Sequence, residues 1–252
     1  MWPGVSPLLF PIVGWARNGE IRVDGRSYPM GVHGFAAGEV FEVASTTADE
    51  VRFELCDNAR TRAQYPFGFR LSMTYRVLQN GIAMEVRITN SDIRPMPYAF
   101  GLHPGFCWPL SGQDRAGHLV HFAREETPEV PEIAPGGLFS DRRRSVPMER
   151  GVLQLTDELL AREALCFLDA RSSSVVFEAP DGSKLTVDAQ GFRHWALWSR
   201  PPAPFLCIEA WTGHGDPEHF SDDLSRKPSM ILLAPGETGV HKAAFTFCPG
   251  KG

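Results

Sequence analysis

Two neighbouring segments alternate apolar and polar residues, and this pattern predicts a pair of antiparallel β-strands. The alternation covers residues 69–77 and 82–88, and a period of two residues places every second side chain on one face of a sheet. The sequence Gln-Asn-Gly at 79–81 separates the two segments. It indicates a hairpin turn, with Gly81 where positive φ is favoured.

Short runs rich in β-branched and aromatic residues recur along the chain, bounded by turn signals from 24 glycines and 21 prolines. They predict further strands at 51–55, 174–178, 184–188, 194–199, 205–209, 230–233 and 243–247. Only residues 152–164 have helical character, and they could equally form 3₁₀ turns. Residues 109–150 lack periodicity and are expected to form long loops. We therefore expect an all-β antiparallel sandwich rather than an alternating β/α fold.

The composition fits one globular unit that acts on a small molecule. A chain of 252 residues with 43% hydrophobic residues holds one large core, so we expect a single domain over residues 1–252. The net charge is −5 and no long basic block occurs, which argues against nucleic acid as a partner. The basic run at 142–144 is expected in a solvated turn. No apolar stretch approaches the roughly 18 residues of a membrane span, so no membrane partner is expected.

The cysteines and the start of the chain bear on metal binding and location. The five cysteines are odd in number, widely spaced and mostly inside apolar runs, which indicates reduced core thiols. Cys-x-x-Cys and His-x-x-x-His spacings do not occur in the sequence, so we predict no metal site. Residues 1–4 lack the basic start and apolar core of a secretory signal, and we expect a cytoplasmic protein.

Three islands of sequence place an ionisable residue beside glycine or aromatic residues within apolar, strand-like segments. They are residues 31–36 with His33, residues 97–106 with His103 and residues 204–211 with Glu209. Glu209 follows the run Phe-Leu-Cys-Ile, and burial there would raise its pKa toward that of a useful base. His103 titrates near neutrality and suits a residue that gives and takes a proton.

Each of these residues also has a structural interpretation. Glu209 could be a carboxylate that faces water at a strand end, and His103 and His33 could be hydrogen-bonded histidines that close a strand. Tryptophans near the islands favour a sugar ligand, because sugar rings present apolar C–H faces that stack on aromatic side chains. The candidates for such stacking are Trp198 and Trp211, although alternation at 195–198 could also bury Trp198 in the core.

Five ordered motifs, taken together, resemble the aldose 1-epimerase family over nearly the whole chain, from about Trp2 to His241. They are Pro-Leu-Leu-Phe-Pro-Ile-Val-Gly at 7–14, His-Gly-Phe-Ala at 33–36, Tyr-Pro-Phe at 65–67, the segment 96–106 and the segment 204–211. Within the family, the chain is similar to the bacterial branch of galactose-mutarotase-like proteins often found beside lactose genes.

The resemblance implies a large antiparallel β supersandwich of the galactose mutarotase type, with a shallow cleft for a free aldose. It also implies interconversion of the α and β anomers without a metal or an organic cofactor. Glu209 matches the family's general base, which takes the proton of the anomeric hydroxyl. His103 matches the histidine before Pro-Gly-Phe that donates a proton to the ring oxygen, and His33 matches a second histidine that holds the substrate.

The chain departs from the family pattern at three positions. Many relatives have an arginine where this chain has Ala37 and Gly38, so we expect a free hexose rather than a phosphorylated sugar. The branch often contacts the sugar near an Asp-Ala-Leu sequence, which is Glu-Ala-Leu at 163–165 here, and we assign Glu163 as a substrate-binding residue. Ala210 replaces the proline that usually follows the catalytic glutamate, which leaves the chemistry unchanged.

Relatives also carry initial strands before the motif at 7–14, whereas this chain begins almost at that motif. An exposed sheet edge is normally covered or paired, so we expect a homodimer that uses this edge.

Two other functions stay open. A glycoside hydrolase or lyase on the same scaffold needs two facing carboxylates or a tyrosine base, and Glu163 or Asp216 would have to be the partner of Glu209. A non-catalytic carbohydrate-binding or sugar-sensing module would keep the aromatic cleft without turnover. The presence of both His103 and Glu209 favours an aldose 1-epimerase.

Overall fold

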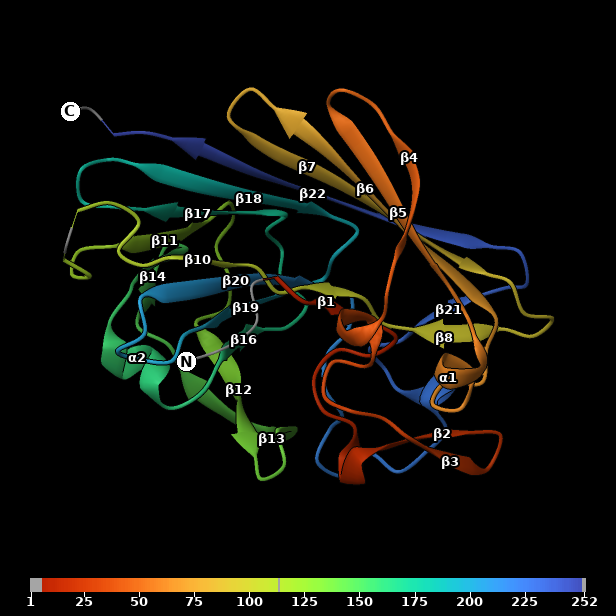
Figure 1. Ribbon diagram of the computed structural model, residues 1–252. Helices are drawn as coiled ribbons and strands as arrows, with labels where there is room; N and C mark the ends of the chain where they lie inside the picture. The colour runs from red at the N-terminus through yellow and green to blue at the C-terminus, as the bar shows by residue number, and fades with distance from the viewer. Residues whose placement is uncertain (1–5, 113, 251–252) are drawn as a thin grey trace.

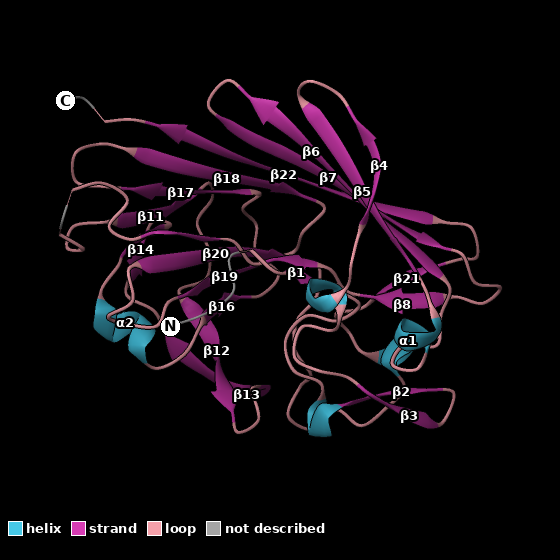
Figure 2. Cartoon of the chain, viewed as in Figure 1, coloured by secondary structure: helices cyan, strands magenta, loops and turns pink. Residues whose placement is uncertain are grey.

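Two large antiparallel sheets dominate the computed structural model, which describes residues 6–112 and 114–250. One sheet lies above the other (Figure 1), and the few helices are short segments within connections (Figure 2). The expected all-β fold is confirmed. Trp2, where the family resemblance starts, and the rest of residues 1–5 lie outside the described residues.

The larger sheet has ten strands. In order they are β14 (Met148–Glu149), β15 (Val152–Gln154), β11 (Leu119–Phe122), β17 (Ser174–Glu178), β18 (Lys184–Gln190), β22 (Thr238–Cys248), β7 (Gly81–Asn90), β6 (Phe69–Leu78), β5 (Glu50–Cys56) and β4 (Glu42–Thr46). The predicted hairpin over 69–88 is confirmed as β6 and β7. The predicted strands at 51–55, 174–178, 184–188 and 243–247 are confirmed as β5, β17, β18 and part of β22.

The smaller sheet has six strands and carries two of the three islands. Its order is β1 (Leu8–Leu9), β9 (Gly101–Leu102), β20 (Phe205–Trp211), β19 (His194–Trp198) and β16 (Leu165–Phe167), with β10 (Gly105–Cys107) also paired with β20. Three two-stranded ribbons complete the fold: β2 (Glu20–Val23) with β3 (Arg26–Pro29), β12 (Glu129–Ala134) with β13 (Leu138–Ser145), and β8 (Met96–Tyr98) with β21 (Ile231–Leu233).

The two faces of β20 have different roles. Leu206, Ile208 and Ala210 pack with β17 and β18 into the core between the two large sheets. Successive side chains of a strand point to opposite faces, so Glu209 and Trp211 lie on the other face of the small sheet. The ribbon β12–β13 lies on that side, away from the ten-stranded sheet (Figure 1).

Gly81 is required for a reason other than the predicted one. It is the first residue of β7 and pairs with Thr246 of β22, and its φ lies outside the left-handed region. A Cβ atom at Gly81 would lie 1.9 Å from the carbonyl oxygen of Phe245. The close approach of β22, rather than a turn with positive φ, therefore demands glycine.

The segment 109–150 was expected to form loops, and this prediction is wrong. It forms β11, β12, β13 and β14, and the arginines at 142–144 lie in β13 rather than in a turn. The ribbon β12–β13 belongs to neither large sheet, and the second half of β13 is mostly exposed and polar, so it shows little apolar alternation. The segment 152–164 divides into β15 and the short helix α2 (Asp157–Ala161).

The outer strand β4 ends the ten-stranded sheet, and all five of its residues are exposed. The homodimer expected at a sheet edge stays a prediction. Light scattering checks it, and a monomeric mass at micromolar concentration would contradict it. Among the described residues, no helix is long and apolar enough to cross a membrane.

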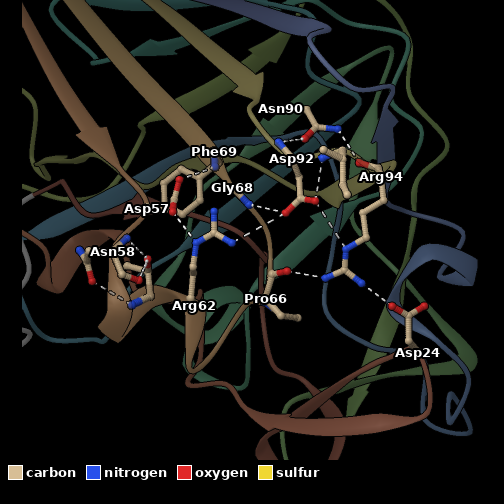
Figure 3. Close-up of polar contacts among 12 residues, drawn as sticks. Asp24, Asp57, Asn58, Arg62, Pro66, Gly68, Phe69, Asn90, Asp92 and Arg94 are labelled. Carbon is tan, nitrogen blue, oxygen red and sulfur yellow. Dashed lines mark hydrogen bonds and ion pairs between the residues drawn. The ribbon is translucent and has the colours of Figure 1, made fainter.

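A polar network fixes the corner where β5, β6 and β7 meet (Figure 3). Asp92 accepts hydrogen bonds from the backbone N–H groups of Gly68, at 2.9 Å, and Ile93, at 2.8 Å. Its carboxylate also lies 3.8 Å from Nε of Arg94 and 4.0 Å from the guanidinium of Arg62. The guanidinium of Arg94 donates a hydrogen bond to the carbonyl oxygen of Pro66. Its central carbon also lies over the Phe67 ring, 4.3 Å from the ring centroid. The network thus holds the Tyr-Pro-Phe segment in place.

We expect Asp92→Asn to destabilise the fold by about 1–3 kcal/mol, because it weakens hydrogen bonds to a charged acceptor. Burial alone would raise the pKa of Asp92, but the bonds from Gly68 and Ile93 and the charges of Arg94 and Arg62 outweigh it and lower the pKa below 3.8. A lowered folded pKa gives stability that is present above the unfolded pKa and is lost as pH falls through the folded pKa.

Urea unfolding at several pH values between about 3 and 7 measures the free energy of unfolding across the range in which Asp residues titrate. The wild type should lose this contribution on acidification, and Asp92→Asn should not. Asp141→Asn, at an exposed position of β13, is the control. Equal acid sensitivity of the wild type and Asp92→Asn would contradict the prediction.

Candidate active site

Glu209 and His103, the two residues predicted as catalytic, are in contact. Glu209 lies in β20, and His103 directly follows β9, which pairs with β20 through Leu102 and Ala210. The Nε2 atom of His103 is 3.2 Å from Oε1 of Glu209. Both residues are buried, with 7% and 2% of their surfaces exposed. Strand pairing therefore joins two islands that are a hundred residues apart in the sequence.

The second carboxylate oxygen of Glu209 has its own partner. Nε1 of Trp211 donates a hydrogen bond of 3.0 Å to Oε2, from two residues along the same face of β20. Burial raises the pKa of Glu209 well above its usual value of 4.5, and the hydrogen bond from Trp211 opposes this rise. The protonated form of Glu209 therefore persists to unusually high pH.

The backbone fixes His33 in one orientation beside this pair. His33 and Gly34 both have positive φ, 64° and 76°. The backbone N–H of Gly14 donates a 3.1 Å hydrogen bond to Nδ1 of His33, so the neutral ring carries its proton on Nε2. The rings of His33 and His103 meet edge to face, with centroids 5.6 Å apart. His33 thus offers an N–H donor beside His103.

Burial keeps both histidines neutral. It lowers the pKa of His33 to about 4, and burial together with the nearby His33 lowers the pKa of His103 to about 3. Trp198, at the end of β19, lies edge to face with His103 at a centroid distance of 5.7 Å. At a pH above the pKa of His103 and below the pKa of Glu209, the two residues together hold one titratable proton.

Glu163, the predicted binding residue, is held by the ribbon β12–β13. One of its oxygens accepts a hydrogen bond from the backbone N–H of Ile133 at 3.1 Å, and the other lies 3.0 Å from Nε of Arg144. Burial raises the pKa of the Cys166 thiol, and the nearby Glu209 and Glu163 raise it further. The role of Glu163 in binding stays a prediction.

Asp216, the other carboxylate considered for a hydrolase, is also engaged. Nζ of the buried Lys227 lies 2.9 Å from one oxygen of Asp216, and the backbone N–H of Arg17 donates to the other at 2.9 Å. Both oxygens of Asp216 are therefore engaged by groups of the protein itself. The described residues contain no group of three or more His, Cys, Asp or Glu side chains that could hold a metal ion.

A separate groove of about 450 Å³ lies on the ten-stranded sheet. Charged side chains line it, among them Arg76 and Lys242, which pair with Glu50 and Glu85. None of the predicted site residues lines this groove. Arg76 and Lys242 are already paired with carboxylates, so the buried His103–Glu209 pair remains the candidate site.

Two further histidines, His194 and His214, lie on the face of the small sheet that carries Glu209. They were not identified from the sequence. His194 is the first residue of the buried strand β19 and, like Glu209, is a polar residue beside an apolar run. This pattern in the sequence could have identified His194 as a candidate. His214 lies in the connection after β20, where the sequence has no periodicity to indicate which way the side chain faces.

Comparison with known proteins identifies the family of the chain. Residues 6–246 match the family model described as aldose 1-epimerase. The chromosomal protein LacX of Lactococcus lactis is 29% identical over 248 residues, which cover 94% of this chain and 83% of LacX.

Solved structures show the same fold. A galactose mutarotase-like protein from Lactobacillus casei has a TM-score of 0.89 and 25% identity, covering 96% of this chain and 85% of its own. A galactose mutarotase related enzyme from Lactobacillus acidophilus has a TM-score of 0.86 and 28% identity, covering 97% and 83% of the two chains. The chain belongs to the aldose 1-epimerase family, in the branch that contains LacX.

Proposed function

We propose that the protein is an aldose 1-epimerase that interconverts the α and β anomers of a free hexose. The observation that carries the proposal is the buried contact of 3.2 Å between His103 and Glu209. Burial shifts the pKa of the imidazole down and the pKa of the carboxyl up. A pair of titratable groups whose environments shift their pKa values in this way is typical of acid–base catalysis.

The proposed reaction moves one proton through the sugar. The reaction starts from the minor form of the pair, in which the proton has moved from Glu209 to Nε2 of His103 across their 3.2 Å contact. His103 gives this proton to the ring oxygen while Glu209 takes the proton of the C1 hydroxyl, and the C1–O5 bond breaks. The open aldehyde is neutral, and the proton count of the two residues together is unchanged. Rotation about C1–C2 and the reverse transfers close the ring as the other anomer. Ring opening ends with the proton on Glu209, the arrangement that the pKa shifts favour.

Other residues on this face have binding roles in the proposal. The N–H group on Nε2 of His33 donates to the ring oxygen or a hydroxyl. Trp198 and Trp211 offer aromatic surface to the apolar face of the ring, and Glu163 contacts a hydroxyl from the side of β12–β13. Membership of the aldose 1-epimerase family supports a sugar substrate.

Polarimetry of freshly dissolved α-glucose and α-galactose tests the proposal. The protein should speed the return to equilibrium rotation beyond the rate in buffer. Sugar binding seen by NMR titration without any acceleration would contradict the enzyme and favour the non-catalytic sugar-binding module. Release of reducing ends from an oligosaccharide would favour the hydrolase instead.

We expect Trp211→Phe to shift the pH profile of the reaction upward. Activity requires one proton in the His103–Glu209 pair, so kcat/KM falls as pH rises through the pKa at which that proton leaves. The hydrogen bond from Trp211 lowers the pKa of Glu209. Its removal lets the proton stay to higher pH.

The measurement is kcat/KM against pH, corrected for the rate in buffer. Trp198→Phe is the matched control, and it should change KM while leaving the alkaline limb where it is. An alkaline limb that stays in place or moves to lower pH in Trp211→Phe would count against the assignment.

A further inference from the structure

A second pair of histidines lies on the same face of the small sheet as the candidate active site. In the pairing of β19 with β20, Ala196 lies opposite Glu209 and His194 lies opposite Trp211. Residues two apart on a strand share a face and are about 7 Å apart. His194 therefore lies beside the catalytic pair, at a distance that one hexose ring can span.

His194 presents a buried N–H group that makes no hydrogen bond within the described part of the chain. Its exposed surface is 3%, and its Nδ1 atom accepts a 2.9 Å hydrogen bond from the backbone N–H of Asp169. The proton of the neutral ring is therefore on Nε2. Within the described residues, this Nε2 atom has no hydrogen-bond partner. A buried polar atom without a partner is rare and calls for an explanation.

His214 supplies the complementary group. Its Nδ1 lies 2.8 Å from the carbonyl oxygen of Gly215 and donates to it, so Nε2 of the neutral ring is an acceptor. The rings of His194 and His214 are 5.3 Å apart at 75°. The ring of Phe139 of β13 also packs on His214, with ring centroids 5.0 Å apart.

Both rings are neutral at physiological pH. Burial is the main cause, and it lowers the pKa of His194 to about 3 and that of His214 to about 4. The ammonium of Lys227 also lowers the pKa of His214, and the same charge disfavours a metal cation there. The two rings thus offer one donor and one acceptor without net charge.

We propose that His194 and His214 form a subsite that binds one hydroxyl group of the aldose and so selects among free hexoses. The inference rests on the proposed function, since it takes the sugar to lie on this face. A hydroxyl donates one hydrogen bond and accepts others, which matches Nε2 of His214 as acceptor and Nε2–H of His194 as donor. A sugar that lacks that hydroxyl leaves both histidine atoms unpaired.

Two substitutions separate the sugar contact from the contact with Asp169. His194→Asn keeps an acceptor at the position of Nδ1 and removes the donor at Nε2, whereas His194→Gln keeps a donor near the position of Nε2. Each is assayed by polarimetry with a parent hexose and with its 2-, 3-, 4- and 6-deoxy analogues. His121→Asn, in β11 of the ten-stranded sheet, is the control that removes a remote histidine.

We expect His194→Asn to lower kcat/KM for the parent hexose by about 10-fold or more, mainly through KM. For one deoxy analogue the wild type and the variant should be equally active, because the contact is already missing. His194→Gln should retain most of the parent rate, and His121→Asn should retain all of it.

An equal loss for every analogue, or no loss for any, would overturn the subsite. If the wild type does not speed anomerisation at all, the same comparison is made with dissociation constants from NMR titration of the same sugars. The proposed enzyme then fails by itself. The subsite stands if one deoxy analogue alone is insensitive to His194→Asn, and it falls if none is.

Discussion

Replacing Glu209 with glutamine is expected to reduce kcat for anomerisation by about 100-fold to 10,000-fold, the usual worth of a general acid–base group. Glutamine has the shape of the protonated carboxyl and still offers an oxygen to the N–H of Trp211. It cannot accept the proton of the C1 hydroxyl, nor pass a proton to His103. On the proposed mechanism the chemical step stops, while sugar binding changes little.

Polarimetry at saturating α-galactose gives kcat, and NMR titration with the same sugar shows that the variant still binds. Glu126→Gln is the matched control, because Glu126 is also a buried carboxylate and accepts hydrogen bonds from the backbone of Arg171 and Ser172. It should leave kcat unchanged. Full activity of Glu209→Gln would remove Glu209 from the mechanism.

Substituting Gly34 by alanine should destabilise the protein by about 3 kcal/mol or more, as overpacking and a left-handed backbone act together. Gly34 has a φ of 76°, and a Cβ atom there would lie 2.2 Å from the carbonyl oxygen of Phe10 and 2.8 Å from the ring of Pro11. These neighbours belong to the segment after β1, which cannot move without displacing His33.

Gly25→Ala is the control for this prediction. Gly25 has nearly the same φ, 74°, but nothing lies within 4 Å of the position its Cβ would take. Only the backbone cost of about 1–2 kcal/mol applies there. Urea unfolding of both variants measures the difference, and equal destabilisation would show that steric contact with Phe10 contributes nothing.

The strands that could be predicted are those with one face in the core. Residues 69–77 alternate because Leu71 and Met73 are buried against the rest of the core, and the same logic found β5, β17 and β18. The ribbons β2–β3 and β12–β13 were missed, although Ile21 and Val23 of β2 and Val130 of β12 belong to the core. The pair β2–β3 has an Asp-Gly turn in which both residues, Asp24 and Gly25, have positive φ, a sequence signal for a tight hairpin that was overlooked.

The candidate site was predictable in its parts and not in its assembly. A glutamate inside an apolar strand is costly unless it has a role, which singled out Glu209. Its contact with His103 depends on the register that places Leu102 opposite Ala210, and long-range register cannot be read from one sequence. The engagement of Glu163 by Arg144 depended on a ribbon that was not predicted.

The division of β20 into two faces has a consequence for how this protein can change over time. Leu206, Ile208 and Ala210 maintain the fold, while Glu209 and Trp211 on the other face act on the sugar in our proposal. Mutations at alternate positions of one strand are therefore under different selection. A lineage could acquire a preference for another sugar through His194 or its neighbours on that face and keep its folding stability, and a library restricted to those positions would explore new substrates with few unfolded members.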